Sequence, residues 1–305
     1  MENQVYHIPA LLPEALKWLN IRNNGIYIDV TFGGGGHSRG ILSELDRAGS
    51  GHLFSLDQDS DAINRALPHP RLTLIHGNFR YLRNFARFYG FNGKADGILA
   101  DLGVSFHHFD DPGRGFSFRF EGPLDMRMNR LAPKTAADIL NGSPEERLEE
   151  IFRLYGEFRN SRKLAKTVVR ERALKEFTTT EQFLSVADTV CDPRRRKQEL
   201  AQIFQALRIE VNDEIGALKS LLEQSLDVLA PGGRLAIITY HSLEDRLVKN
   251  FMKTGNLEGK TEQDFYGRNL SPFRLLTSRP VVPSEEEIAR NPRSRSAKMR
   301  VAEKI

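Results

Sequence analysis

The stretch Gly25-Ile-Tyr-Ile-Asp-Val-Thr-Phe-Gly-Gly-Gly-Gly-His37 joins a run of strand-forming residues to four consecutive glycines. Its β-branched and apolar side chains predict a buried strand over residues 25–31. After the glycines, Ile41, Leu42 and Leu45 recur at the spacing of a helix. A strand, a glycine-rich turn and a helix in this order are typical of the first unit of a doubly wound α/β domain.

The same alternation continues along the first hundred residues. Strands are expected at 51–57, 71–76 and 94–102, and helices at 61–66 and 79–89. Strands that alternate with helices form right-handed crossovers and therefore a mostly parallel sheet. We predict an α/β domain with a Rossmann-like, doubly wound sheet.

The alternation stops after Ser105, and residues 106–196 contain no pattern of a buried strand. A long helix is expected over 199–229, closed by Pro231-Gly-Gly233, and the next strand over 234–240. Residues 106–196 hold four helical patterns, at Thr135–Leu140, Pro144–Tyr155, Ser161–Ala173 and Thr180–Val190.

Two arrangements of domains are compatible with this pattern. Two consecutive domains would leave the strand at 234–240 without a sheet, so we favour a helical domain inserted into the α/β domain. The expected boundaries are 1–105 for the first part of the α/β domain, 106–200 for the insertion and 201–305 for the second part.

Composition limits the class of protein. The chain has 305 residues, enough for a sizeable core, and a formal net charge of +4, which permits a polyanionic partner without requiring one. Cys191 is the only cysteine, which excludes a disulfide framework, and the eight histidines are not clustered with acids, so no metal site is predicted. No secretory signal or long apolar run is visible, and we expect a cytoplasmic protein that does not contact membranes. The oligomeric state is not determined by the sequence.

The glycine run Gly33–Gly36 predicts a nucleotide-binding loop, because glycine allows tight turns and lets a ligand approach the backbone. A flexible strand–helix turn is the alternative. Asp57 ends the second strand about 20 residues later, where an acid accepts hydrogen bonds from the ribose of an adenosine cofactor. NAD and S-adenosylmethionine both remain open at this point, although Gly40 comes one residue too late for the dinucleotide-binding spacing.

The ends of the third and fourth strands favour a methyltransferase. Phe79 follows strand three and can stack on an adenine ring, although it can equally be a core residue. Asp101-Leu-Gly-Val-Ser105 follows strand four, where class I methyltransferases place an acid and the groups that meet the substrate.

Several longer motifs resemble one bacterial family. They are Ile28-Asp-Val-Thr-Phe-Gly-Gly-Gly-Gly-His-Ser38, Asp96-Gly-Ile-Leu-Ala-Asp-Leu-Gly-Val-Ser105, Arg114-Gly-Phe-Ser-Phe118, Gly122-Pro-Leu-Asp-Met-Arg-Met128, Phe204-Gln-Ala-Leu-Arg-Ile-Glu-Val-Asn-Asp-Glu214, Leu229-Ala-Pro-Gly-Gly-Arg234, His241-Ser-Leu-Glu-Asp-Arg246 and Asn291-Pro-Arg-Ser-Arg-Ser296. With these motifs the chain resembles, nearly end to end, the MraW family of ribosomal RNA small subunit methyltransferases, which methylate N4 of a cytidine in the decoding centre of 16S rRNA.

The resemblance implies a class I S-adenosylmethionine-dependent methyltransferase fold interrupted by a helical substrate-recognition domain. It also implies that S-adenosyl-L-methionine is the cofactor. The family's cofactor contacts correspond to Gly35, Gly36, His37, Asp57, Phe79 and Asp101. A further cofactor contact of the family is usually a Gln, and His108 stands at that position here. Within the glycine loop, Gly34 stands where the family usually has a basic or polar residue.

Catalysis is assigned to two positions. The cytosine N4 amine is a poor nucleophile on which positive charge develops during attack, so acceptor oxygens near it stabilise the transition state. We expect the Ser105 hydroxyl and main-chain carbonyls beside it to hold the amine. His241 follows strand five and is a candidate for contacting the substrate or handling a proton, whereas Ser242 and Asp245 are expected to form a capping box.

Basic residues are expected to contact RNA. The run Arg194-Arg-Arg-Lys197 and the C-terminal Arg290, Arg293, Arg295, Lys298 and Arg300 are candidates for phosphate binding, although such runs can also be solvated faces. The expected partner is 16S rRNA within the small ribosomal subunit or its assembly intermediate. Two alternatives are an RNA-binding assembly factor that lacks catalysis and a nicotinamide-dependent oxidoreductase.

Overall fold

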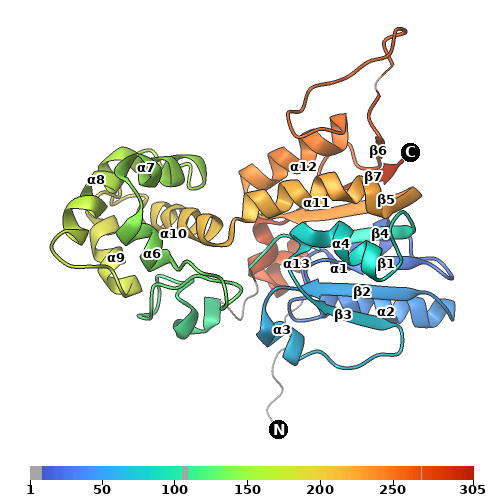
Figure 1. The fold of residues 1–305 in the computed structure, drawn as a ribbon, viewed down its shortest axis with the longest axis horizontal. Coiled ribbons are helices and arrows are strands. Elements are labelled where there is room, and N and C mark those ends of the chain that lie inside the picture. Colours follow the sequence, from blue (N-terminus) through green and yellow to red (C-terminus); the bar gives the residue numbers. More distant parts are fainter. Residues whose placement is uncertain (1–8, 105–108, 269) are drawn as a thin grey trace. The chain divides into compact units, whose positions relative to one another are not determined.

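The structure is a computed structural model that describes residues 9–104, 109–268 and 270–305. The chain divides into two compact units, drawn in Figure 1. The α/β unit comprises Met1–Gly103 and Ile215–Ile305, and the helical unit comprises Val104–Glu214. Each unit is described by itself below.

The α/β unit is built on a seven-stranded sheet with the order β3-β2-β1-β4-β5-β7-β6. Its strands are β1 (Ile26–Asp29), β2 (His52–Asp57), β3 (Leu72–His76), β4 (Ala95–Asp101), β5 (Leu229–Thr239), β6 (Phe273–Leu275) and β7 (Lys298–Lys304). The first five run parallel, and β7 lies antiparallel to both β5 and β6. The predicted α/β class with a mostly parallel, doubly wound sheet is confirmed.

Helices cover both faces of this sheet. Successive strand residues point to opposite faces, so Ile28 packs in one core cluster and Tyr27 in the other. On the face of Ile28 lie α4 (Leu82–Phe88), α11 (Glu214–Val228) and α12 (Ser242–Thr254), and on the opposite face lie α1 (Leu12–Leu19) and α2 (Gly36–Ala48). The remaining short elements of this unit are α3 (Ser60–Asn64), η1 (Phe79–Tyr81), α13 (Glu285–Arg290) and η3 (Pro292–Ser296).

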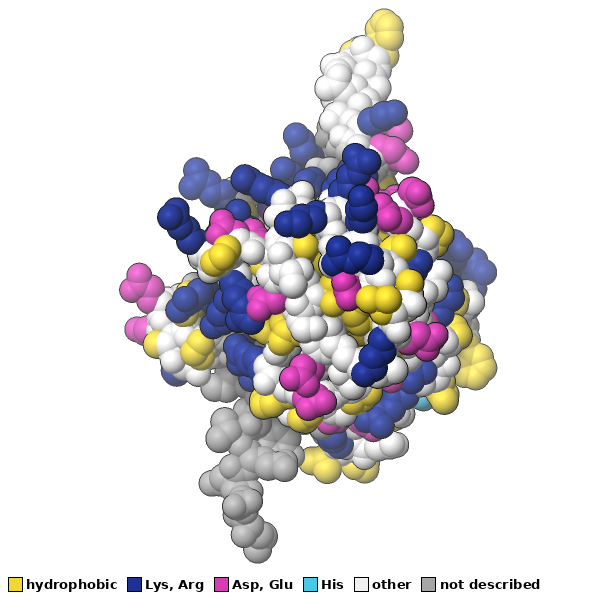
Figure 2. All heavy atoms as spheres, turned by 90° about the vertical axis from the view of Figure 1, so that its left-hand side faces the viewer, with side chains coloured by type: hydrophobic (Ala, Val, Ile, Leu, Met, Phe, Trp, Pro, Cys, Tyr) yellow, Lys and Arg dark blue, Asp and Glu magenta, His cyan; other side chains and the backbone are white. Residues whose placement is uncertain are grey.

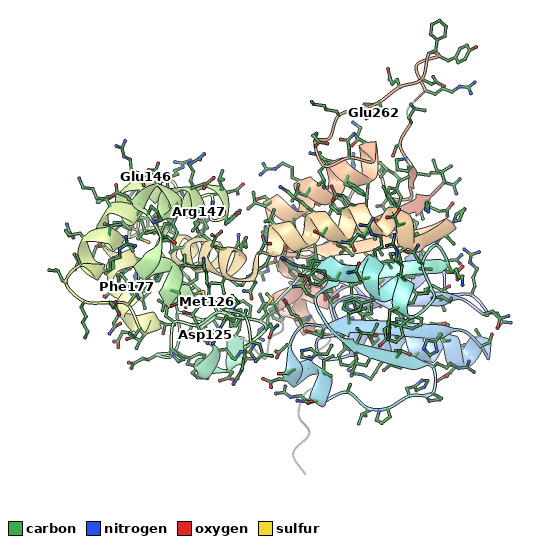
Figure 3. All side chains as sticks on the ribbon, in the orientation of Figure 1. Asp125, Met126, Glu146, Arg147, Phe177 and Glu262 are labelled. Atoms are coloured by element: carbon green, nitrogen blue, oxygen red, sulfur yellow. The ribbon has the colours of Figure 1, made fainter. Side chains whose placement is uncertain are left out.

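The helical unit has its own apolar core. It contains η2 (Pro112–Arg114), α6 (Ala136–Gly142), α7 (Glu145–Leu154), α8 (Ser161–Arg172), α9 (Thr180–Asp188) and α10 (Arg196–Asn212). Met126 and Phe177 are buried in this core, and Arg147 joins α7 to α10 by an ion pair of 2.7 Å with Glu210 (Figure 3). The four helices predicted between residues 135 and 190 are all present.

The structure corrects three expectations about the chain after residue 196. The long helix expected over 199–229 is two helices, because Asp213 adopts a left-handed φ of 45° and ends α10. The helical unit extends to Glu214, so the boundary expected at residue 200 falls inside α10. Moreover, Pro231-Gly-Gly233 lies within β5 and does not close the preceding helix, which ends at Val228.

Within the part of the chain that the structure describes, no helix is both long enough and apolar enough to span a membrane.

Candidate active site

The glycine loop and the end of β2 are joined by hydrogen bonds to Asp57. The backbone N–H of Gly33 donates to Asp57 Oδ2 at 2.7 Å, and that of Asp59 donates to Oδ1 at 2.8 Å. Burial raises the pKa of Asp57 to about 6, although these two bonds oppose the shift. A carboxylate has about four acceptor positions, so each oxygen of Asp57 can still accept one more hydrogen bond. The carboxylate is therefore fixed in place and able to bind further donors.

Two glycines of the loop are required by its geometry. Gly35 has a φ of 70° and precedes α2, and a Cβ at this position would lie 2.9 Å from the Phe32 ring. At Gly36, the first residue of α2, a Cβ would lie 2.8 Å from the Pro9 side chain. Gly34 differs, since a Cβ there would meet nothing within 4 Å. The loop thus brings bare backbone and the start of a helix to the carboxyl ends of the strands, which is the ligand-binding edge of such sheets.

Asp29 organises this edge from the end of β1, a role that the sequence analysis missed. Ser38 Oγ donates to Asp29 Oδ2 at 2.6 Å and therefore accepts from Ser55 Oγ, which lies 2.8 Å away. Thr31 Oγ1 contacts Asp29 Oδ1 and accepts the backbone N–H of Asp101 at 2.7 Å. The buried Asp29 carboxylate therefore connects the ends of β1, β2 and β4. The sequence feature that could have identified Asp29 is its position at the end of a buried strand.

His37 and Asp101 form a close pair. His37 is buried in α2, its Nε2 lies 3.0 Å from the carbonyl oxygen of Ala10, and its Nδ1 lies 3.6 Å from Asp101 Oδ2. Because a carbonyl only accepts, Nε2 carries a proton. Burial raises the pKa of Asp101, while His37 and Tyr240 oppose this shift. Asp101 Oδ1 is buried and has no hydrogen-bond partner among the described residues, so it is available to a ligand.

Phe79 is the first residue of η1, three residues after the end of β3. Its ring is half-buried and packs against the core cluster on the α4 side of the sheet. Asn78 precedes it, accepts the N–H of Arg80 at 2.9 Å and donates to Gln58 at 2.7 Å. Packing against the core accounts for one side of the ring, and the exposed remainder is available for stacking.

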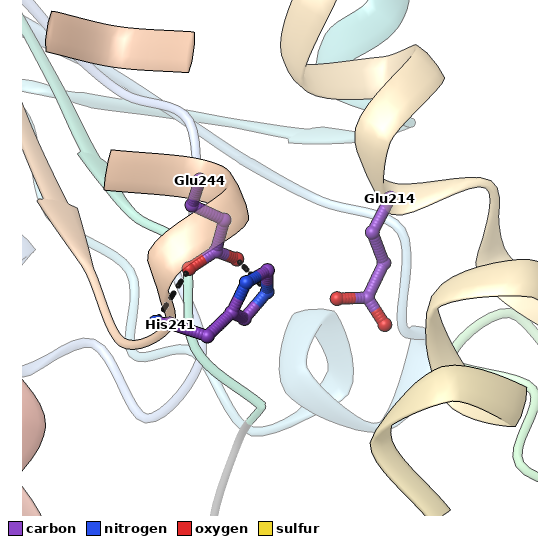
Figure 4. Close-up of side chains that lie close together, drawn as sticks. All are labelled: Glu214, His241 and Glu244. Atoms are coloured by element: carbon purple, nitrogen blue, oxygen red, sulfur yellow. Dashed lines mark hydrogen bonds and ion pairs between the residues drawn. The ribbon is translucent and has the colours of Figure 1, made fainter. Parts of the chain in front are cut away.

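Tyr240 and His241 follow β5, and Glu244 lies in the first turn of α12. Glu244 Oε2 accepts the backbone N–H of Tyr240 at 2.9 Å and that of His241 at 3.4 Å, while Glu244 Oε1 lies 3.1 Å from His241 Nε2 (Figure 4). The His241 side chain is 9% exposed, and its Nδ1 has no hydrogen-bond partner among the described residues. Burial and the neighbouring Asp101 raise the pKa of Tyr240, so its hydroxyl remains a donor.

The expected capping box of Ser242 and Asp245 is wrong. The N-cap of α12 is His241, and its partner three residues on is Glu244. Asp245 instead pairs with Arg300 of β7, at 2.6 and 3.0 Å. Glu214, also drawn in Figure 4, forms a two-bond ion pair with Arg208 inside the helical unit, at 2.8 and 2.9 Å. No metal site is proposed from these residues.

Two of the predicted site residues, Ser105 and His108, lie outside the described residues. The others lie on the α/β unit, at the carboxyl ends of its strands or in the segment that follows each strand. Gly35, Gly36 and His37 come after β1, Asp57 ends β2, Phe79 comes after β3, Asp101 ends β4 and His241 comes after β5.

The predicted RNA-binding cations divide into paired and unpaired groups. Arg196 pairs with Asp188, at 2.5 and 2.9 Å, and Arg300 with Asp245, so both charges are compensated within the protein. Arg300 is moreover part of β7, and its side chain is 11% exposed, which argues against contact with RNA. Arg194 and Lys197 are exposed and line an open hollow at the start of α10.

Comparison with known proteins places the whole chain in one family. The profile of the MraW methylase family matches residues 4–305. A relative from Parabacteroides distasonis is 58% identical over 304 residues, with 100% of this chain and 99% of the relative covered. One from Cytophaga hutchinsonii is 50% identical over 302 residues, with 98% of this chain and 100% of the relative covered. Both relatives are named ribosomal RNA small subunit methyltransferase H.

Proposed function

The chain belongs to the MraW methylase family, and on this basis we propose that it transfers a methyl group from S-adenosylmethionine to N4 of a cytidine in the decoding centre of 16S rRNA. The substrate would be the small ribosomal subunit or its assembly intermediate, in the bacterial cytoplasm. The names of the relatives support a ribosomal RNA substrate, and the family supports methyl transfer.

The observation that carries the cofactor assignment is the contact between Gly33 and Asp57. It holds an acceptor with free lone pairs beside a glycine loop whose backbone a ligand can approach. The ribose hydroxyls of S-adenosylmethionine would donate to Asp57, and Gly35 and Gly36 would leave room for its amino-acid part. Phe79 would stack on the adenine. His37 and Asp101 would bind polar groups of the cofactor that lie near the end of β4. The residues present therefore fit this cofactor.

When bound, S-adenosylmethionine supplies an electrophilic methyl group on its sulfonium sulfur. The protein has to hold the amine in line with that group and to accept hydrogen bonds from it as positive charge develops. Asp101 Oδ1, the carbonyls of the segment after β4 and the Ser105 hydroxyl are proposed to supply these acceptors. His241, with its unpaired Nδ1, is proposed to contact the base or to receive the proton that the amine loses.

The cofactor assignment is tested by thermal unfolding with two ligands. S-adenosylhomocysteine should raise the melting temperature and NAD should not, whereas the reverse result would favour an oxidoreductase. Asp57→Ala should weaken binding of S-adenosylhomocysteine about 10- to 150-fold, because a hydrogen bond to a charged acceptor contributes roughly 1.5–3 kcal/mol. Unchanged binding would remove Asp57 from the cofactor site.

The catalytic role is tested by single-turnover methyl transfer to small subunits. Ser105→Ala should slow the methyl-transfer step with cofactor affinity unchanged, and an undiminished rate would exclude Ser105 from the mechanism. Binding of small-subunit RNA by the wild-type protein without any methyl transfer would favour an assembly factor that lacks catalysis.

A further inference from the structure

Helix α8 of the helical unit has one apolar and one strongly basic face. Leu164, Ala165 and Val168 are buried in the core of the unit. The exposed side chains at the spacing of the opposite face include Arg162, Lys163, Lys166 and Arg170, and the exposed Arg159 precedes the helix. Because a helix rises 1.5 Å per residue, charges four residues apart are separated by about 6 Å along its axis. The cations therefore form a row along the helix.

All but one of these cations lack an acidic partner among the described residues. Glu171 is the only acid between residues 159 and 175, and it pairs with Arg170 at 2.7 Å. Among the described residues, no ion pair involves Arg159, Arg162, Lys163 or Lys166. Like charges at such spacing destabilise a helix by a few tenths of a kcal/mol per pair. The unpaired cations of this row can therefore bind an anion outside the protein.

Elsewhere in the same unit, several cations are paired with acids. Arg147 pairs with Glu150 and Glu210, and Arg196 pairs with Asp188. The absence of such acids around α8 is therefore a local feature and does not reflect a general shortage of acids in the unit.

One hydrogen bond links the start of α8 to the segment that leads into α10. Asn160 Nδ2 donates to the carbonyl oxygen of Val190 at 3.1 Å, which holds the start of α8 beside the beginning of the segment between α9 and α10. From there the chain leads to Arg194 and Lys197, which line the open hollow. Figure 2 shows one face of the molecule, on which many Lys and Arg side chains are exposed together with scattered acidic and hydrophobic ones.

We propose that the exposed cations of α8 and α10 form one track that binds the phosphate backbone of RNA. The α8–α10 track consists of Arg159, Arg162, Lys163, Lys166, Arg194 and Lys197. No aromatic residue occurs between 159 and 172, so this part of the track has no side chain on which a base could stack. It therefore positions the RNA and does not select the methylated nucleotide. The inference rests on the proposed function and identifies the surface that holds its substrate.

The test is the salt dependence of RNA binding by the full-length protein. In the variant Arg162→Gln/Lys163→Gln/Lys166→Gln, glutamine retains the helix propensity of the replaced residues. Each lost phosphate contact should reduce the log–log salt slope by roughly 0.7–0.9, so three should flatten it by about two units. The probe is rRNA from small subunits of cells that lack this enzyme, and affinity for S-adenosylhomocysteine should be unchanged.

A matched control removes three exposed cations from helices of the α/β unit, Lys17→Gln/Lys219→Gln/Lys249→Gln. It makes the same change in net charge and should keep the parental slope. The proposed track would be wrong if the α8 variant kept the parental salt slope of RNA binding. It would also be wrong if the control variant flattened that slope equally. Loss of binding to intact subunits with an unchanged slope on free rRNA would indicate contact with a ribosomal protein and would overturn it too.

The same experiment separates this inference from the function on which it rests. If the wild-type protein methylates small subunits while the α8 variant keeps the parental slope, the track is wrong and the proposed function stands. If the wild-type protein neither binds nor methylates small-subunit RNA, the proposed function is wrong and the track is wrong with it.

Discussion

Nδ1 of His37 lies 3.6 Å from Oδ2 of Asp101, and the opposite nitrogen of the His37 ring donates to the carbonyl oxygen of Ala10. With Nε2 protonated, a neutral imidazole would present a lone pair to the carboxylate. The hydrogen bond to Ala10 thus fixes the orientation in which Nδ1 faces the Asp101 carboxylate. This pair lies at the end of β4, where the proposed methyl transfer takes place.

Replacing His37 should shift the acidic limb of the pH profile of methyl transfer. His37 opposes the rise in the pKa of Asp101 that burial causes. In His37→Gln, Asp101 should therefore stay protonated to a higher pH. As the pH is lowered, the single-turnover rate of the variant should start to fall at a higher pH than the rate of the wild type. An identical profile in variant and wild type would show that the pair does not control Asp101.

Asp57 should make both stability and cofactor binding depend on pH. Its pKa is raised from 3.8 to about 6 in the folded protein, so between these values the folded state holds a proton that the unfolded chain has released. The contribution of Asp57 to stability therefore falls as the pH rises from about 4 to 6. Compared with the wild type, Asp57→Asn should gain in free energy of unfolding over this interval, measured by urea denaturation at each pH.

The ribose hydroxyls favour the ionised form of Asp57, since they donate hydrogen bonds to it. Binding of S-adenosylhomocysteine should therefore weaken below pH 6, by up to about tenfold per pH unit for one proton. Titration calorimetry from pH 5 to 7.5 measures this dependence. An affinity that is constant over this range in the wild type would contradict the proposed contact.

The glycine loop offers a matched pair of substitutions. Gly35→Ala should destabilise the fold by about 1–2 kcal/mol, because an alanine at a φ of 70° is strained and its Cβ would clash with Phe32. It should also weaken cofactor binding. Gly34→Ala should change neither property by much, since its Cβ would enter open space. Equal effects of the two substitutions, measured by thermal unfolding and calorimetry, would contradict the loop geometry.

Arg300 should behave as a structural residue. Arg300→Gln removes the partner of Asp245 at a site where both side chains are largely buried, which should cost about 3 kcal/mol of stability. The salt slope of RNA binding should keep its wild-type value. A flatter salt slope with unchanged stability would instead indicate that Arg300 contacts RNA.

Local patterns predicted the parts of the fold that depend on neighbouring residues. The first four strands, the glycine loop and the acids Asp57 and Asp101 follow from apolar runs that end in turns, and each lies where it was expected. The break at Asp213 could not be foreseen in this way. Helical periodicity continues on both sides of it, and a left-handed φ at an aspartate has no distinct signal in the sequence.

Features that join distant segments were missed for a different reason. Lys298–Lys304 alternates exposed or half-buried charged residues with buried Met299 and Val301, as a strand with one buried face does. From the sequence alone, its cations are equally compatible with contacts to RNA. Only the position of Asp245 shows that Arg300 is paired. The bonds from Asp29 to Ser38 and onward to Ser55 likewise require three segments to meet, so no single stretch of sequence predicts them.

The most direct test is to identify the nucleoside that receives the methyl group. Small subunits from cells that lack this enzyme are incubated with the wild-type protein and tritiated S-adenosylmethionine, and their rRNA is digested to nucleosides and separated. We predict that the label elutes with N4-methylcytidine, and that it maps to the decoding centre of 16S rRNA. Label in 5-methylcytidine or in a methylated uridine or adenosine would contradict the account.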